Sequence, residues 1–265
     1  MRCSLVITTH DRPDALARVL RSLSTQTRWP DEVIIAEDGS SQEIGAMVDR
    51  LRISAPASVQ HVRQYHAGFR AGMIRNKAIA RSSSDYIILL DGDMVMHPEF
   101  VADHAAAARA GHYSQGVRIL LDESATHRLI MTDADLPGAF GPGLGFLRRS
   151  YVVRAPALQR LLRRAANTVI AIKSCNQGFW RRDLIAVNGF DETMTGWGSE
   201  DKELCARLDN AGLRRQSLIF SAIAFHLAHP PASRETAGHN EARWRQTRRS
   251  GRRRCEQGIA AHLPN

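Results

Sequence analysis

The chain has 265 residues, 43% of them apolar and 24% charged, which fits one large globular α/β domain or two small ones. No apolar stretch approaches the roughly 20 residues that span a bilayer, and the N-terminal apolar run is too short for a signal peptide, so we expect a cytoplasmic protein. The net charge of +9 comes almost entirely from arginine, which favours anionic partners, although codon usage in a GC-rich genome explains it equally well.

Strands and helices alternate in the N-terminal part. Cys3–Thr9 has the β-branched, apolar composition of a buried strand, and Pro13 suits the first turn of a helix whose apolar residues recur at helical spacing from Leu16 to Leu23. Further strands are predicted at Val33–Ala36, Val59–Val62 and Tyr86–Leu90, and further helices at about Gln42–Leu51 and Ala71–Arg81. This alternation predicts a Rossmann-like α/β fold, a mostly parallel sheet with helices on both faces.

The second half of the chain is patterned differently. Leu136–Gly145 is rich in glycine and proline and is expected to be a loop. A strand at Leu218–Phe225 is expected to deliver His226. Helices are predicted at about Ala155–Ala166, which is basic and amphipathic, at Phe179–Asn188 and at Glu200–Ala211. The four cysteines have no spacing typical of zinc sites or disulfides, so reduced thiols are expected: Cys3, Cys175, Cys205 and Cys255.

Polar residues follow three of the four strands predicted in the N-terminal part. Thr8 and His10 end the first, Asp38 follows the second, and Asp91 and Asp93 follow the fourth. Ligands of open α/β sheets bind beyond the carboxyl ends of the strands, so these side chains predict one site. An acid at position 38 can accept a hydrogen bond from a base or ribose; an ordinary Asp-Gly turn is the alternative.

Asp91-Gly92-Asp93 places two carboxylates on either side of a glycine, directly after an apolar strand. Two such groups can converge on one hard cation and its bound diphosphate, and the cation offsets the charge that develops on a leaving phosphate. The alternative is an acidic turn that caps the helix expected near Pro98.

Trp197-Gly198-Ser199-Glu200-Asp201 combines an aromatic ring with two carboxylates at the start of a helix. Negative charge at a helix N-terminus is favoured in any case, which explains the acids but not a tryptophan flanked by glycines. A sugar ring can stack on the tryptophan, and a carboxylate beside it can remove a proton from an acceptor hydroxyl.

His226 or His229 would complete the metal shell begun by Asp93, although lone histidines are more often structural. Residues three apart in an extended segment face opposite ways, so only one of the two is expected to bind metal.

Together these patterns resemble inverting glycosyltransferase family 2 enzymes of the GT-A fold. Ser4–Arg12, Glu37–Ser40 and Leu90–Asp93 look like the nucleotide-binding half of that family. Asn188–Arg207 is similar to the C-terminal part of β-1,4-galactosyltransferases and of bacterial chondroitin polymerase modules. The resemblance implies a nucleotide-sugar-binding half in residues 1–110, an acceptor-binding and catalytic half of the same domain in residues 111–240, and a basic tail or helix in residues 241–265.

The resemblance also implies roles for matching positions. Thr8, His10 and Asp38 would hold the uracil and ribose of a UDP-sugar. Further donor contacts would come from Arg12, Arg75 and Asp91.

Asp93 would hold Mn²⁺ or Mg²⁺, with His226 the better match to the family's metal-binding histidine and His229 the alternative. A histidine ligand favours Mn²⁺. Asp201 would be the catalytic base, while Glu200 and Trp197 would bind sugar.

Two positions depart from the family pattern. Glu37 replaces the commoner aspartate in front of Asp38, and Ser199 replaces the glycine that commonly precedes the two acids. Serine at 199 is expected to stiffen or narrow the acceptor loop.

The implied activity is metal-dependent, inverting transfer of a hexose or N-acetylhexosamine from a UDP-sugar to a hydroxyl of a glycan or glycolipid, as in bacterial surface polysaccharide or lipopolysaccharide synthesis. A retaining GT-A enzyme is a close alternative because the fold does not fix stereochemistry. A sugar-phosphate nucleotidyltransferase is less favoured, since Thr8–Arg12 is not a glycine-rich phosphate loop.

Arg243–Arg254 concentrates the positive charge. This segment carries no known nucleic-acid-binding motif, so specific nucleic-acid binding is not expected. Peripheral contact with the anionic inner face of a membrane would suit a lipid-linked acceptor, and a solvated basic helix is the alternative.

Overall fold

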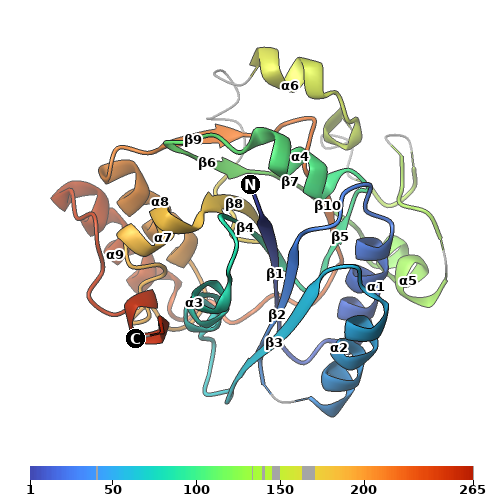
Figure 1. The fold of residues 1–265 in the computed structure, drawn as a ribbon, viewed down its shortest axis with the longest axis horizontal. Coiled ribbons are helices and arrows are strands. Elements are labelled where there is room, and N and C mark those ends of the chain that lie inside the picture. The colour runs from blue at the N-terminus through green and yellow to red at the C-terminus, as the bar shows by residue number, and fades with distance from the viewer. Residues whose placement is uncertain (40, 133, 139–140, 145–149, 163–170, 265) are drawn as a thin grey trace.

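A seven-stranded sheet and a three-stranded sheet form the framework of the computed structural model (Figure 1), which describes residues 1–265 except 40, 133, 139–140, 145–149, 163–170 and 265. The strand order is β3-β2-β1-β4-β8-β6-β9 in the large sheet and β5-β10-β7 in the small one. The first four strands run parallel, as predicted: β1 (Cys3–Thr9), β2 (Glu32–Asp38), β3 (Ser58–Gln64) and β4 (Tyr86–Asp91).

Helices cover both faces of this sheet because side chains alternate along each strand. Leu5 and Ile7 of β1 belong to the core shared with α1 (Pro13–Ser24) and α2 (Gln42–Ser54). Val6 faces the opposite core, which includes residues of α3 (Ala71–Arg81) and α8 (Glu200–Asn210). The predicted mixed α/β architecture is confirmed.

The predicted helix at Phe179–Asn188 is wrong at both ends. Phe179 and Trp180 belong to β8 (Asn176–Trp180), which pairs antiparallel with β4, and the helix α7 covers only Arg181–Ala186. Phe179 stacks on Tyr113 of β6 (His112–Gln115), with ring centroids 5.8 Å apart. Pairing and packing across the sheet therefore override the local helical pattern. The last strand of this sheet is β9 (Arg214–Ser217).

The predicted strand at Leu218–Phe225 is wrong in its first half. Phe220 and Ala222 have left-handed φ values of 62° and 46°, which break an extended chain, and β10 covers Ile223–His226. It still ends on His226, as predicted. The small sheet is completed by β5 (Met94–Met96) and β7 (Val117–Leu120).

The remaining described elements flank the two sheets. They are α4 (Phe100–Ala107), α5 (Glu123–Met131) and α6 (Pro156–Leu162). The predicted helix at Ala155–Ala166 corresponds to α6, and its residues 163–166 lie outside the described part. Within the predicted loop at 136–145, residues 136–138 and 141–144 are in no helix or strand, and the others lie outside the described part.

The basic C-terminal segment forms a helix that packs on α8. It contains α9 (Ala237–Ser250) and a final short 3₁₀ helix, η3 (Ile259–His262). Arg207 of α8 binds the fully buried Glu203 through two guanidinium nitrogens, and Thr247 and Arg252 donate to the same carboxylate at 3.0 and 2.7 Å. Several of its arginines are thus used inside the fold.

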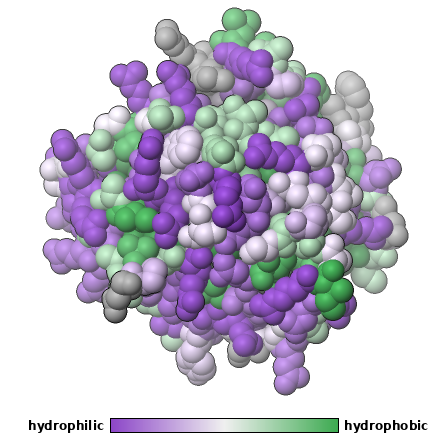
Figure 2. Space-filling model, viewed as in Figure 1, coloured by the Kyte–Doolittle hydropathy of each residue, from purple (hydrophilic) through white to green (hydrophobic). Residues whose placement is uncertain are grey.

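One face of the molecule can be described by the hydropathy of its residues. Figure 2 shows hydrophilic residues over most of one face, with apolar residues in small patches. Among the described residues, no helix combines the length and apolar character that crossing a bilayer would require.

The Arg207–Glu203 pair predicts a large stability difference between two similar substitutions. Removing Arg207 leaves a buried carboxylate with fewer partners, so Arg207→Ala should lower the free energy of unfolding by about 3–5 kcal/mol. Arg245 and Glu241 form the same i, i+4 pair at 2.7 Å, but with side chains 60% and 43% exposed, so Arg245→Ala should cost less than about 0.5 kcal/mol. Urea unfolding of both variants would test this, and equal losses would contradict it.

Candidate functional site

The carboxyl ends of β1, β2 and β4 meet at one edge of the large sheet. Thr8 pairs with Ala36 on one side and with Asp91 on the other. Gly92 donates its N–H to the Thr8 carbonyl at 2.7 Å, and a Cβ at this position would lie 2.9 Å from the Thr9 Cβ. Only glycine fits this close approach, which turns the chain between the two aspartates.

Four polar side-chain atoms at this edge are buried without a hydrogen-bond partner in the described part of the chain: Thr8 Oγ1, Asp38 Oδ1, Arg75 Nε and Asp93 Oδ1. Buried polar atoms in native proteins are nearly always satisfied. Several buried polar atoms without hydrogen-bond partners at one edge of a sheet are typical of a site that binds a polar ligand.

Arg75 links this edge to the start of α8. Its guanidinium binds Asp91 Oδ1 at 2.9 Å and reaches Glu200 Oε1 at 3.5 Å, with the Phe190 ring centroid 5.4 Å from its central carbon. Burial raises the pKa of Asp91, and Arg75 offsets only part of that effect. The structure thereby joins Asp91 and Glu200, which come from different halves of the sequence.

Asp93 gathers three nitrogen-bearing side chains. Its Oδ2 atom lies 3.6 Å from His226 Nε2, 3.2 Å from His229 Nε2 and 3.5 Å from Arg12. Burial alone would raise the pKa of Asp93, but the hydrogen bond with His229 and the nearby positive charges lower it overall. Asp93, His226 and His229 offer ligand atoms within 4.8 Å of one another, as a metal site requires.

Both histidines face Asp93, so the expectation that they face opposite ways is wrong. The strand β10 ends at His226, residues 227–229 belong to no strand, and the two ring centroids lie 5.0 Å apart. His229 Nδ1 lies 2.7 Å from the Pro230 carbonyl, so that nitrogen donates and Nε2 is the one oriented toward Asp93. Burial lowers the pKa of His226 to about 4, which keeps its ring neutral, the form that binds metal.

The segment around Trp197 is shaped by left-handed residues. Gly196, Gly198 and Ser199 have φ values of 76°, 111° and 64°, and a Cβ at Gly196 would lie 2.2 Å from Thr236 Oγ1. Trp197 is 37% exposed, and the Arg234 guanidinium lies 5.3 Å from its ring centroid. The ring is therefore available at the surface beside α8.

Glu200 and Asp201 occupy the first turn of α8 and differ in their surroundings. Asp201 accepts backbone N–H bonds from Ser174 at 3.1 Å and from Lys202 at 2.7 Å. Burial, reinforced by repulsion from Asp201, raises the pKa of Glu200 to about 7. The site thus holds one carboxylate fixed by the backbone and one that holds its proton near neutral pH.

The part of this edge near His10 and Asp38 contains one residue that the sequence did not reveal. His66 stacks on His10, with ring centroids 4.2 Å apart and 15° between planes, and its Nδ1 lies 3.5 Å from Asp38 Oδ1. No motif marks a lone histidine in a loop. Glu37 has a structural role, since it binds His61 at 2.7 Å and accepts the Ser41 N–H at 2.6 Å; Ser40 lies outside the described residues.

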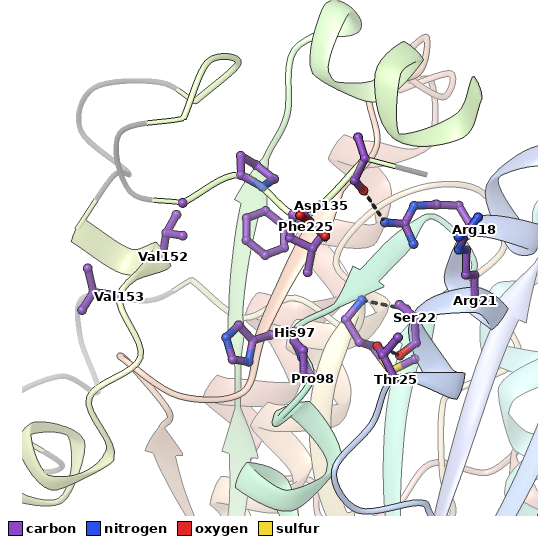
Figure 3. Close-up of a pocket in the computed structure, with 15 residues that line it drawn as sticks. Arg18, Arg21, Ser22, Thr25, His97, Pro98, Asp135, Val152, Val153 and Phe225 are labelled. Atoms are coloured by element: carbon purple, nitrogen blue, oxygen red, sulfur yellow. Dashed lines mark hydrogen bonds between the residues drawn. The ribbon is translucent and has the colours of Figure 1, made fainter. Parts of the chain in front are cut away.

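A cavity of about 500 Å³ lies apart from these residues. Figure 3 shows it between α1 and the segment around Asp135, with the Phe225 ring in its wall. Arg18 donates to the Ala134 carbonyl at 3.1 Å along its side. None of the predicted site residues lines this cavity, so its volume does not identify it as the candidate functional site.

Comparison with known proteins adds to this geometry. The sequence profile described as Glycosyl transferase family 2 matches residues 4–182. The chain belongs to glycosyl transferase family 2. A second profile, described as the N-terminal domain of galactosyltransferase, matches residues 167–230, the part of this glycosyltransferase that carries Trp197 and Asp201. Both resemblances inferred from the sequence are confirmed.

Curated relatives include large polysaccharide synthases. A hyaluronan synthase of Pasteurella multocida is 26% identical and a chondroitin synthase of Escherichia coli 28% identical, each over 89% of this chain. The chain spans only 26% and 37% of their lengths, so the glycosyltransferase corresponds to one part of each relative.

Solved structures share the fold. S. aureus TarS 1-349 in complex with UDP-GlcNAc superimposes with a TM-score of 0.66 at 15% identity, over 99% of this chain and 69% of that one. GalNAc-T7 with UDP, GalNAc and Mn²⁺ gives 0.59 at 13% identity, over 86% and 44%. The predicted GT-A fold is confirmed.

The raised pKa of Glu200 predicts a pH-dependent stability. The folded protein keeps a proton that the unfolded chain releases near the ordinary glutamate pKa of 4.5, so the free energy of unfolding falls as pH rises from there through about 7. Glu200→Gln removes this dependence. The melting temperature of Glu200→Gln minus that of the wild type should therefore increase by several degrees from about pH 5 to pH 8, with both proteins measured in EDTA. A difference that stays constant with pH would contradict the raised pKa.

Proposed function

We propose that this family 2 member transfers a hexose or N-acetylhexosamine from a UDP-sugar to a hydroxyl of a glycan or glycolipid, with inversion and with the help of a divalent cation. The observation that carries the proposal is Arg75, which joins the strand-end Asp91 to Glu200 near Trp197. Donor-side and acceptor-side groups therefore lie in one continuous site. The TarS complex with UDP-GlcNAc supports the choice of donor class.

The donor would occupy the edge where buried polar atoms lack partners. Asp38 and His10 would contact the base, and Thr8 and Asp91 the ribose or sugar. Arg12, near Asp93, would face the diphosphate.

The residues around Asp93 fit a cation. Asp93 Oδ1 is buried and has no hydrogen-bond partner among the described residues, and His226 and His229 turn Nε2 toward the same carboxylate. Mixed nitrogen and oxygen ligands suit Mn²⁺ better than Mg²⁺. A bound cation would offset the charge that develops on UDP as it leaves.

The acceptor would stack on Trp197 and present its hydroxyl to Asp201. Asp201 would take the hydroxyl proton while the acceptor oxygen forms a bond to the anomeric carbon and the bond to the UDP oxygen breaks on the opposite face. The Ser174 and Lys202 N–H groups orient the carboxylate for this role. Glu200 would hold the sugar through a hydrogen bond.

Bacterial surface polysaccharide or lipopolysaccharide synthesis is the setting we propose, supported by the polysaccharide synthases among the relatives. Contact with an anionic membrane through Arg243–Arg254 stays a prediction. Arg243, Arg252 and Arg254 donate hydrogen bonds within the fold, so such contact would rest on the exposed members of the segment: Arg245, Arg248, Arg249 and Arg253.

The donor and metal assignments are tested together. A panel of UDP-sugars, scored by UDP release with an oligosaccharide or glycolipid acceptor, should show activity that EDTA abolishes and Mn²⁺ restores. Asp93→Asn should weaken Mn²⁺ binding at least about tenfold in calorimetry, because it loses the central ligand charge. Asp49→Asn, on the exposed face of α2, is the matched control. Full activity in EDTA would refute the metal role.

Asp201→Asn tests the catalytic base. The loss of a general base should lower kcat by about 10²–10⁴-fold while UDP affinity stays close to that of the wild type. NMR of the wild-type product should show the anomeric configuration opposite to that of the donor. If Glu200→Gln abolished transfer and Asp201→Asn left it near normal, Asp201 would not be the base. A retained configuration would favour the alternative, retaining mechanism.

A further inference from the structure

His66 reproduces two contacts expected of a nucleobase. Its ring lies nearly parallel to that of His10 at 4.2 Å, which is stacking distance. Its Nδ1 approaches Asp38 Oδ1 at 3.5 Å, and that oxygen has no hydrogen bond in the described part of the chain. A flat ring with an N–H aimed at Asp38 is also the chemistry by which a pyrimidine would bind here.

The contacts that hold His66 are weak. The side chains of His10 and His66 are 47% and 42% exposed, so neither ring is enclosed. The distance of 3.5 Å to Asp38 is too long for a strong hydrogen bond. A ligand that stacks on His10 and donates a shorter hydrogen bond to Asp38 would therefore displace His66 at modest cost.

The loop that carries His66 is tied at both ends and open at its tip. Gln64 donates to the Arg70 carbonyl at 3.3 Å, and Arg70 in turn donates to the Tyr65 carbonyl. Gly68 has a φ of 75° with nothing within 4 Å of where its Cβ would be. His66 can thus leave the base position while the loop ends stay in place.

We propose that His66 is an internal stand-in for the base of the donor nucleotide, which the base displaces on binding. The inference rests on the proposed function, because it assumes that the base of a UDP-sugar stacks at His10 beside Asp38. With such a stand-in, the apparent affinity for the nucleotide equals the intrinsic affinity multiplied by the fraction of molecules in which the base position is open. A ligand without a flat ring cannot replace the two contacts of His66 and therefore does not displace it.

The test compares two ligands and two side chains. Calorimetry with UDP and with inorganic pyrophosphate, in saturating Mn²⁺, is run on the wild type, His66→Ala, His66→Ser and Tyr65→Ala. Removing the stacked ring should tighten UDP binding about three- to tenfold in both His66 variants. Pyrophosphate has no base, so its affinity should not change. Tyr65 is 85% exposed next to His66, and its variant should bind UDP as the wild type does.

Other results overturn the proposal. UDP binding that is unchanged or weaker in His66→Ala and His66→Ser would show that His66 is not a competitor of the base. An equal gain for pyrophosphate would place the effect at the phosphates. If the wild type bound no UDP and transferred no sugar, the proposed function would fail as well. If it bound UDP and transferred sugar without any gain in the His66 variants, this inference alone would fail.

Discussion

The buried guanidinium of Arg75 is the interaction on which the geometry of the site depends. A charge removed from water is tolerated only when it is paired, and the two acids that pair with it are Asp91 from β4 and Glu200 from α8. The end of β4 in the large sheet and the start of α8 are therefore held at a fixed separation. Group transfer needs that, because donor and acceptor must meet at bonding distance.

Arg75 is itself held by contacts from the C-terminal half. The next residue, Asn76, donates to the Phe190 carbonyl at 2.8 Å and accepts the Phe190 N–H at 2.8 Å, which fixes the ring beside the guanidinium. Asn76 also donates to Glu192, and His262 of η3 binds the same carboxylate at 2.7 Å. The final short helix η3 thus supports this edge of the sheet through Glu192 and Asn76.

The sequence predicted the features that depend on local pattern. The four parallel strands, the carboxylates at their ends and the helix that begins at Glu200 follow from hydrophobic periodicity and from the position of polar residues after it. It did not predict β8, which forms by pairing across the sheet, or the start of β10, which follows left-handed residues. It also missed His66, whose role depends only on the ring it meets in space.

Ser199 replaces the glycine that is common at this position, yet it adopts a left-handed backbone conformation. Glycine is common at this position because the chain enters α8 through a left-handed residue, and Ser199 adopts φ 64° all the same. Such a conformation costs a non-glycine residue on the order of 1 kcal/mol, and it persists where surrounding contacts determine it. Here Glu203 donates its N–H to the Ser199 carbonyl at 2.9 Å, and Gly196 and Gly198 carry the rest of the turn.

Compared with glycine, Ser199 therefore adds a side chain at a position that keeps its left-handed backbone conformation. In the described part of the chain its hydroxyl makes no capping bond to α8. A glycine would leave that space open. Gly196, Gly198 and Ser199 thus keep left-handed conformations next to Trp197 and the two acids. That Ser199 narrows the approach to these acids, and so affects acceptor choice, stays a prediction.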